Sequence, residues 1–116
     1  VVKNADQKTI SEVAAESADL TTRAREGALT SADVKGATFT ISNLGPFGVE
    51  QFNAIINPPE VGVLAVGAIL PAALPLEGGE IAVRPLMRYT LSADHRVVDD
   101  QQDAGVYSGG WLFFPA

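Results

Sequence analysis

The stretch Val61-Gly-Val-Leu-Ala-Val-Gly-Ala-Ile69 lies near the middle of the chain and is almost continuously apolar. Runs of this kind, without polar alternation, are typical of strands that are buried on both faces of a sheet. The apolar stretch continues to Leu76, but glycines and prolines interrupt it, so it is too short and too broken to span a membrane. The segment therefore predicts a central strand around which the other elements are arranged.

Turn and strand signals on both sides of this run predict a sheet. Gly78-Gly79 predicts a tight hairpin turn that joins residues near Leu74 to residues near Val83. The two prolines of Asn57-Pro58-Pro59 must end any element before the run, because each removes a backbone donor. The other expected elements are a strand over 37–42, a turn-rich loop over 43–48, a short strand over 52–56 and a strand over 86–92.

Residues 8–26 predict an amphipathic helix, because apolar and small side chains recur at three- and four-residue spacing. Thr9 and Glu12 match a capping box at its start. Arginines in the last turn suit the negative end of the helix dipole, and Gly27 can end the helix. A single helical turn is expected at residues 30–33. This order of elements predicts an α+β fold, a mixed sheet with helices on one side.

Composition excludes several kinds of chemistry. The chain has 116 residues, which suggests one domain or part of one. Its 14 acidic and 8 basic side chains give a net charge of −6, which argues against nucleic acid or an anionic membrane as a partner. The absence of cysteine excludes disulfides, a thiolate nucleophile and thiolate metal ligands, and it suits a reducing compartment. No basic segment followed by an apolar stretch opens the sequence, so no signal peptide is expected.

The single histidine, His95, directly follows the strand expected over 86–92. Histidine can both take and give a proton near neutral pH, which makes His95 a candidate acid–base residue. Asp99 lies four residues on and could fix the loop that presents the ring, while Asp94 and Arg96 flank the ring with opposite charges. By itself the pattern His-x-x-x-Asp is weak, because a lone histidine near a strand end is more often structural.

Ser42 places a hydroxyl at the end of another expected strand. A hydroxyl donor beside a histidine base suits acyl transfer to a thiol, since the base removes the thiol proton and the donor holds the oxyanion. The alternative is a serine that only caps the strand end or a turn.

Five segments along the chain are characteristic in combination: GATFTISNLG at 36–45, FGV at 47–49, FNAIINPPE at 52–60, LAVG at 64–67 and LSADHRVVD at 91–99. Together they resemble the catalytic domain of the dihydrolipoamide acyltransferases (E2) of 2-oxo acid dehydrogenase complexes. Within that family, the Asn-Leu-Gly of the first segment and the Phe-Gly-Val of the second are most similar to the acetyl enzyme of the pyruvate complex. The related chloramphenicol acetyltransferases share the fold and the His-x-x-x-Asp element, but not these loops.

The resemblance implies a chloramphenicol acetyltransferase-like fold and a role for each candidate residue. His95 matches the general base that removes the proton from the thiol of coenzyme A or dihydrolipoamide, and Ser42 matches the donor to the oxyanion. Asp99 matches an aspartate that organises the loop. Coenzyme A and lipoamide are implied as substrates, whereas no metal and no covalent enzyme intermediate are implied, and residues that bind the substrates are not identified.

Family resemblance also implies partners. Family members are trimers that build larger cores, with each active site between two subunits, so His95 and Ser42 would come from different chains. The expected partners are further copies of the chain and other subunits of a 2-oxo acid dehydrogenase complex, with no nucleic acid and no membrane. The expected location is the bacterial cytoplasm, or the mitochondrial matrix in a eukaryote.

The resemblance covers roughly residues 1–99, and the family's catalytic domain is about twice as long as this chain. We therefore expect residues 1–116 to be the C-terminal half of that domain. Residues 100–116 are atypical: Asp100 stands where the family has glycine, and no closing amphipathic helix is visible. An alternative function is a truncated or degenerate, non-catalytic oligomeric core or assembly module. A third interpretation, an unrelated α+β binding domain, would make the motif order a coincidence.

Overall fold

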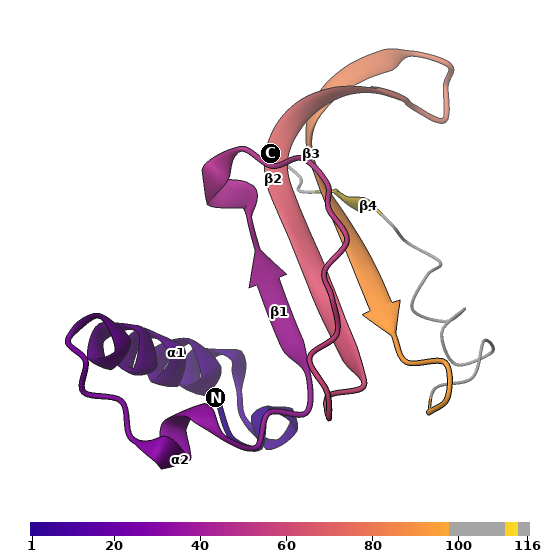
Figure 1. The fold of residues 1–116 in the computed structure, drawn as a ribbon. Helices are drawn as coiled ribbons and strands as arrows, with labels where there is room; N and C mark the ends of the chain where they lie inside the picture. The colour runs from indigo at the N-terminus through magenta and orange to yellow at the C-terminus, as the bar shows by residue number, and fades with distance from the viewer. Residues whose placement is uncertain (98–110, 114–116) are drawn as a thin grey trace. The chain divides into compact units, whose positions relative to one another are not determined.

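The computed structural model describes residues 1–97 and 111–113. It divides into two compact units, Val1–Ala37 and Thr38–Ala116 (Figure 1). The first unit is helical, and the second contains a four-stranded sheet. Within the part of the chain that is described, no helix has the length and apolar character needed to cross a bilayer.

The first unit contains the predicted amphipathic helix, α1 (Ile10–Arg25), preceded by the 3-10 turn η1 (Ala5–Gln7). The predicted capping box is confirmed: the Thr9 hydroxyl accepts from the Glu12 N–H at 3.3 Å, and the Glu12 carboxylate accepts from the Thr9 N–H at 2.7 Å. Gly27 ends the helix with a φ of 69°. This left-handed conformation, which glycine adopts without strain, explains why the helix ends where the sequence predicted.

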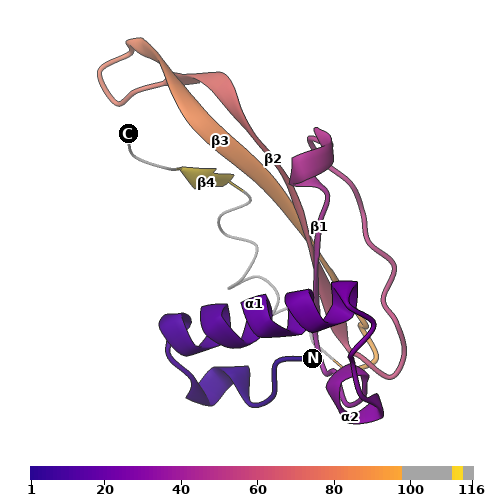
Figure 2. The same cartoon turned by 90° about the vertical axis from the view of Figure 1, so that its left-hand side faces the viewer.

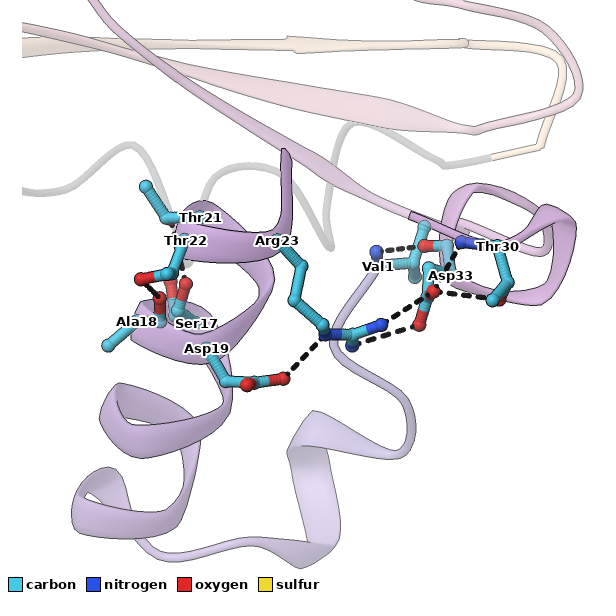
Figure 3. A network of polar contacts seen from close by, with 9 residues as sticks. All are labelled: Val1, Ser17, Ala18, Asp19, Thr21, Thr22, Arg23, Thr30 and Asp33. Carbon is cyan, nitrogen blue, oxygen red and sulfur yellow. Dashed lines mark hydrogen bonds and ion pairs between the residues drawn. The ribbon is translucent and has the colours of Figure 1, made fainter. Parts of the chain in front are cut away.

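The predicted single turn of helix is α2 (Ser31–Val34), and Arg23 connects it to α1 (Figure 3). The Arg23 guanidinium donates to both carboxylate oxygens of Asp33, at 2.8 and 3.1 Å, and to Asp19 at 2.8 Å. Asp33 also accepts from the N–H and the hydroxyl of Thr30, both at 2.7 Å. These donors, Arg23 first, hold the pKa of Asp33 well below its usual value, and Asp33 in turn raises the pKa of Arg23.

The second unit is built on a mixed sheet with strand order β1-β2-β3-β4 (Figure 1). Strand β1 pairs in parallel with β2, while β2 with β3 and β3 with β4 pair antiparallel. The predicted α+β class and mixed sheet are therefore confirmed. The strand bounds are Thr40–Asn43 for β1, Gly62–Pro75 for β2, Ile81–Ala93 for β3 and Trp111–Phe113 for β4, and the 3-10 turn η2 spans Gly45–Phe47.

Strands β2 and β3 form a hairpin that continues well beyond the end of β1, as both views show (Figures 1 and 2). The predicted turn at Gly78-Gly79 closes it, with the Leu76 N–H bonded to the Glu80 carbonyl at 2.8 Å. Both strands are longer than the stretches predicted over 61–69 and 86–92, and they continue through Pro71 and Pro85. Beyond Ile69, β2 pairs only with β3 among the described strands, and an unpaired edge tolerates residues that lack an N–H.

Two predicted strands differ from the structure. The strand expected over 37–42 begins only at Thr40. The prediction of a strand over 52–56 is wrong: this segment is rich in apolar and β-branched residues, but it pairs with no other strand. Its side chains still alternate between half-buried and exposed, with Ile55 93% exposed. Alternation therefore reflects which side chains face the sheet, and strand formation also needs a free neighbouring edge.

The core of the sheet lies in the first half of β2. Val63 and Ala65 are each 2% exposed, whereas the side chains between and beside them on the opposite face are only half-buried. The central strand was expected to be buried on both faces, and in this chain only one of its faces is buried. That buried face carries one of the predicted site residues.

Candidate active site

Ser42 lies in β1 on the buried face of the sheet. In the register of the sheet it pairs with Ala65, and Ala65 pairs with Thr90 on β3. Paired residues on adjacent strands point to the same face, so the half-buried Ser42 side chain lies next to a buried alanine and in one row with a second hydroxyl.

The neighbouring row on this face repeats the arrangement, because Thr40 pairs with Val63 and Val63 pairs with Ser92. Strands β1 and β3 therefore flank the buried residues of β2 with two hydroxyls each. We call this surface the four-hydroxyl face; it consists of Thr40, Ser42, Thr90 and Ser92. Sequence reasoning selected only one of the four, although the spacing Thr-x-Ser occurs at both 40–42 and 90–92.

A buried carboxylate lies at one end of this face and was not predicted. Glu60 is 8% exposed, and its carboxylate accepts from the Thr40 hydroxyl at 2.5 Å. It lies two residues before β2, so this contact fixes the segment that leads into β2 against β1. A buried charge needs such a partner, since burying a carboxylate without a donor is costly.

His95 follows β3 in a tight turn. The Asp94 N–H donates to the Val61 carbonyl at 2.8 Å, so the ladder continues one residue past the end of β3. The Val97 N–H donates back to the Asp94 carbonyl at 2.9 Å, which makes His95 and Arg96 the two central residues of the turn. His95 is exposed, and a ring in this place can reach a molecule that approaches from outside.

The Asp94 carboxylate closes the same turn. It accepts from the Arg96 N–H at 3.0 Å and from the Arg96 guanidinium at 2.9 Å through Nε and 2.6 Å through Nη2. The guanidinium, together with the backbone N–H, lowers the pKa of Asp94 to about 2, and the carboxylate raises the pKa of Arg96. Asp94 is therefore a carboxylate throughout the neutral range.

The structure does not bring Ser42 and His95 together within one chain. Strand β1 runs parallel to β2 and β3 runs antiparallel to it, so the arrowheads of β1 and β3 point in opposite directions (Figure 1). With a rise of about 3.3 Å per residue and about 4.8 Å between strands, the Cα atoms of Ser42 and Ala93 are about 14 Å apart, and the ladder carries Asp94 further away. A serine and a histidine side chain cannot bridge that separation.

Asp99, the third predicted site residue, lies outside the described residues. Within residues 1–97 and 111–113, no three His, Cys, Asp or Glu side chains are grouped closely enough to hold a metal ion. A hollow of about 100 Å³ lies farther along the β2–β3 hairpin, where Arg88 forms an ion pair with Glu50. Neither Ser42 nor His95 lines it, and it is smaller than the roughly 300 Å³ at which ligand pockets begin.

Comparison with known proteins gives one consistent result. Residues 1–108 match the model of the family described as 2-oxoacid dehydrogenases acyltransferase (catalytic domain), so the match extends past Asp99. The chain is 46% identical over 99 residues to the dihydrolipoyllysine-residue acetyltransferase component of the pyruvate dehydrogenase complex of Rickettsia bellii, which covers 85% of this chain and 23% of that protein. The chain thus spans about a quarter of the length of this relative.

Solved structures agree with this result. A probable dihydrolipoamide acetyltransferase from Listeria monocytogenes superposes with a TM-score of 0.83 at 38% identity, over 90% of this chain and 44% of that one. Dihydrolipoamide acetyltransferase from Azotobacter vinelandii gives a TM-score of 0.77 at 38% identity, over 90% of this chain and 42% of that one. The Azotobacter structure comes from work on a serine, a histidine and an asparagine in its catalytic mechanism.

Proposed function

The chain belongs to the 2-oxoacid dehydrogenase acyltransferase (catalytic domain) family, and from this premise we propose that it moves an acetyl group between dihydrolipoamide and coenzyme A. The observation that carries the proposal is His95, the only histidine of the chain, exposed on a hydrogen-bonded turn at the end of a central strand. The names of the relatives support the acetyl group, since the Rickettsia and Azotobacter proteins are both acetyltransferases.

In the proposed reaction His95 acts as the general base. Its ring nitrogen takes the proton of the coenzyme A thiol, and the thiolate attacks the carbonyl carbon of acetyl-dihydrolipoamide, forming a new C–S bond. The Ser42 hydroxyl donates a hydrogen bond to the oxyanion of this tetrahedral intermediate. The intermediate then breaks its C–S bond to dihydrolipoamide, whose thiolate recovers the proton from the imidazolium. The acetyl group never bonds to the enzyme, and the histidine ends as it began.

The strand directions support a site shared between copies of the chain. Because the C-terminal ends of β1 and β3 point in opposite directions, Ser42 and His95 can meet only if different copies supply them. We propose that the His95 turn of one copy lies against the β1 end of another. This arrangement requires self-association, and the proposed partners beyond it are the other subunits of a pyruvate dehydrogenase complex, in the bacterial cytoplasm or the mitochondrial matrix.

A direct assay tests the chemistry. Acetyl transfer from acetyl-coenzyme A to dihydrolipoamide should fall by about 10²–10⁴-fold in His95→Ala, as expected for the loss of a general base. Ser42→Ala should cost about 10²–10³-fold, the usual loss for one oxyanion donor. Equal rates in the wild type and His95→Ala would reject the proposed role of His95.

Mixing two inactive variants tests the shared site. If Ser42→Ala and His95→Ala chains are unfolded together and refolded, random pairing should leave up to about a quarter of the sites with both residues intact. The matched control mixes Ser42→Ala with a chain that carries both substitutions, because no copy then supplies Ser42. Recovery of activity in the first mixture but not in the control supports a site between copies, and no recovery in either argues against it.

A second candidate function is a non-catalytic core or assembly module. It is favoured by the exposed apolar side chains of the β2–β3 hairpin, where Ile69 is 56%, Ile81 76% and Val83 67% exposed. Apolar surface of this kind marks contacts with other protein. The same assay separates the two functions, since an assembly module would associate without any transfer that depends on His95.

A further inference from the structure

We propose that Asp94 is a positioning residue for His95: its side chain closes the turn that directs the imidazole towards the thiol. The inference rests on the proposed function, because it assigns the neighbour of the residue proposed as the base. It starts from the hydrogen bonds of the turn, in which Asp94 takes part through its N–H, its carbonyl and its carboxylate.

The backbone of Asp94 connects the turn to the sheet. Its N–H donates to the Val61 carbonyl at 2.8 Å, one residue before β2, and its carbonyl accepts from the Val97 N–H at 2.9 Å. Both bonds would survive substitution, since they involve only the main chain. They set the place of the turn, but by themselves they leave the peptide between His95 and Arg96 free to rotate.

The carboxylate removes that freedom. By accepting from the Arg96 N–H at 3.0 Å, it fixes the orientation of the peptide that follows His95. This is the local side chain to main chain bond by which aspartate and asparagine stabilise turns. His95 is exposed, and its Cα–Cβ bond leaves the backbone of the turn, so the orientation of that backbone sets the direction in which the side chain starts.

The charge of Asp94 is balanced within the same turn. The Arg96 guanidinium bonds both carboxylate oxygens, at 2.9 Å and 2.6 Å, while the Arg96 side chain remains 86% exposed. With its pKa lowered to about 2, Asp94 accepts these bonds at every pH at which transfer would be assayed. The turn is therefore formed before any substrate arrives, as precise positioning requires.

Asparagine and alanine at this position separate the acceptor from the charge. Asp94→Asn keeps an oxygen that can accept from the Arg96 N–H, whereas Asp94→Ala removes the acceptor. In Asp94→Ala we expect kcat for acetyl transfer to fall about 10- to 100-fold with little change in KM, the loss typical of a misplaced catalytic group. Asp94→Asn should recover most of that loss. Asp6→Ala, at an exposed aspartate in η1, is the matched control for loss of a surface carboxylate.

Two kinetic results would overturn the inference. One is a kcat for Asp94→Ala within about threefold of the wild type while His95→Ala is inactive, because misplacement should cost far more. The other is an Asp94→Asn variant as slow as Asp94→Ala, since the charge and not the turn would then matter. A loss confined to KM would equally oppose a positioning role.

Nuclear magnetic resonance of the full chain gives a second measurement that does not depend on activity. The amide proton of Arg96 should exchange faster in Asp94→Ala than in the wild type, and Asp94→Asn should restore its protection, whereas the amide proton of Val97, which is bonded to a main-chain carbonyl, serves as the internal control. If the wild type shows no transfer that depends on His95, the proposed function fails, and the Arg96 amide alone decides the role of Asp94. Unchanged exchange in Asp94→Ala would then reject the role of its side chain in closing the turn.

Discussion

Replacing Gly67 by alanine should destabilise the sheet, because backbone atoms already occupy the space of a Cβ. A methyl group at this position would lie 2.0 Å from the Glu50 carbonyl oxygen and 3.2 Å from the Arg88 carbonyl oxygen. Gly67 lies within the register shift between Val66 and Ile69, where the segment that follows η2 approaches β2. The strand or the segment must therefore retreat by more than an ångström.

The cost follows from what this retreat breaks. Forcing an extra methyl group into a packed place costs about 1–3 kcal/mol. The Ala68 N–H donates to the Val49 carbonyl at 2.8 Å, and separating the two segments loses this bond, at about 1 kcal/mol. Reduced freedom of the unfolded chain returns up to about 1 kcal/mol. We expect Gly67→Ala to lower the free energy of unfolding by about 2–3 kcal/mol.

Urea unfolding followed by circular dichroism, at one fixed protein concentration, measures this change. The matched control is Gly78→Ala in the hairpin turn, where nothing lies within 4 Å of the added methyl group. Gly78→Ala should leave the unfolding midpoint unchanged or raise it slightly. A Gly67→Ala midpoint that coincides with that of Gly78→Ala would refute the argument, because the close approach of the backbone would then carry no energetic weight.

Two further predictions concern polar contacts. Thr40→Val removes the donor to the buried Glu60 carboxylate and should lower the free energy of unfolding, measured in urea, by about 1–3 kcal/mol. The control Thr38→Val, at an exposed threonine, should change it little, and equal unfolding midpoints for the two variants would contradict the prediction. The pKa of Asp33 is held below its usual value of 3.8, so its contribution to stability is present above that pH and is lost as the pH falls through the folded-state pKa. Thermal unfolding at pH 6 and pH 3 should therefore show a larger loss on acidification in the wild type than in Arg23→Gln, and equal losses would count against the Arg23–Asp33 contact.

Elements set by local chemistry could be predicted from the sequence. The bounds of α1 follow from Thr9, Glu12 and Gly27, whose capping contacts involve residues only a few positions apart. The strand expected over 52–56 failed for the opposite reason, since strand formation depends on a partner that the segment itself does not encode. Strands β2 and β3 extend beyond the strands expected over 61–69 and 86–92 and include Pro71 and Pro85, which lie opposite each other where the edges of the hairpin pair with no further described strand.

The candidate site shows the same division. The motifs around Ser42 and His95 were visible in the sequence, and Ser42 lies in β1 while His95 lies in the turn after β3, as expected. The second row of hydroxyls depends on the register of three strands, which a single sequence does not reveal. Glu60 was missed because a carboxylate after two prolines suggests an exposed turn, and only the fold shows its burial against Thr40.

Strand β2 is the common frame of the two proposed half-sites. Just before β2, the Val61 carbonyl accepts from the Asp94 N–H and so holds the turn that carries His95. On the opposite edge of β2, the Val66 carbonyl accepts from the Leu44 N–H at 3.1 Å and so holds the end of β1, the strand that carries Ser42. Between these two attachments lie Val63 and Ala65, each only 2% exposed. Closely packed interiors resist deformation, so the spacing between the half-sites is rigid. Each copy of the chain would then present a histidine and a serine at fixed, separate points along one strand, and the chemistry would depend on how the copies meet and not on movement within any of them.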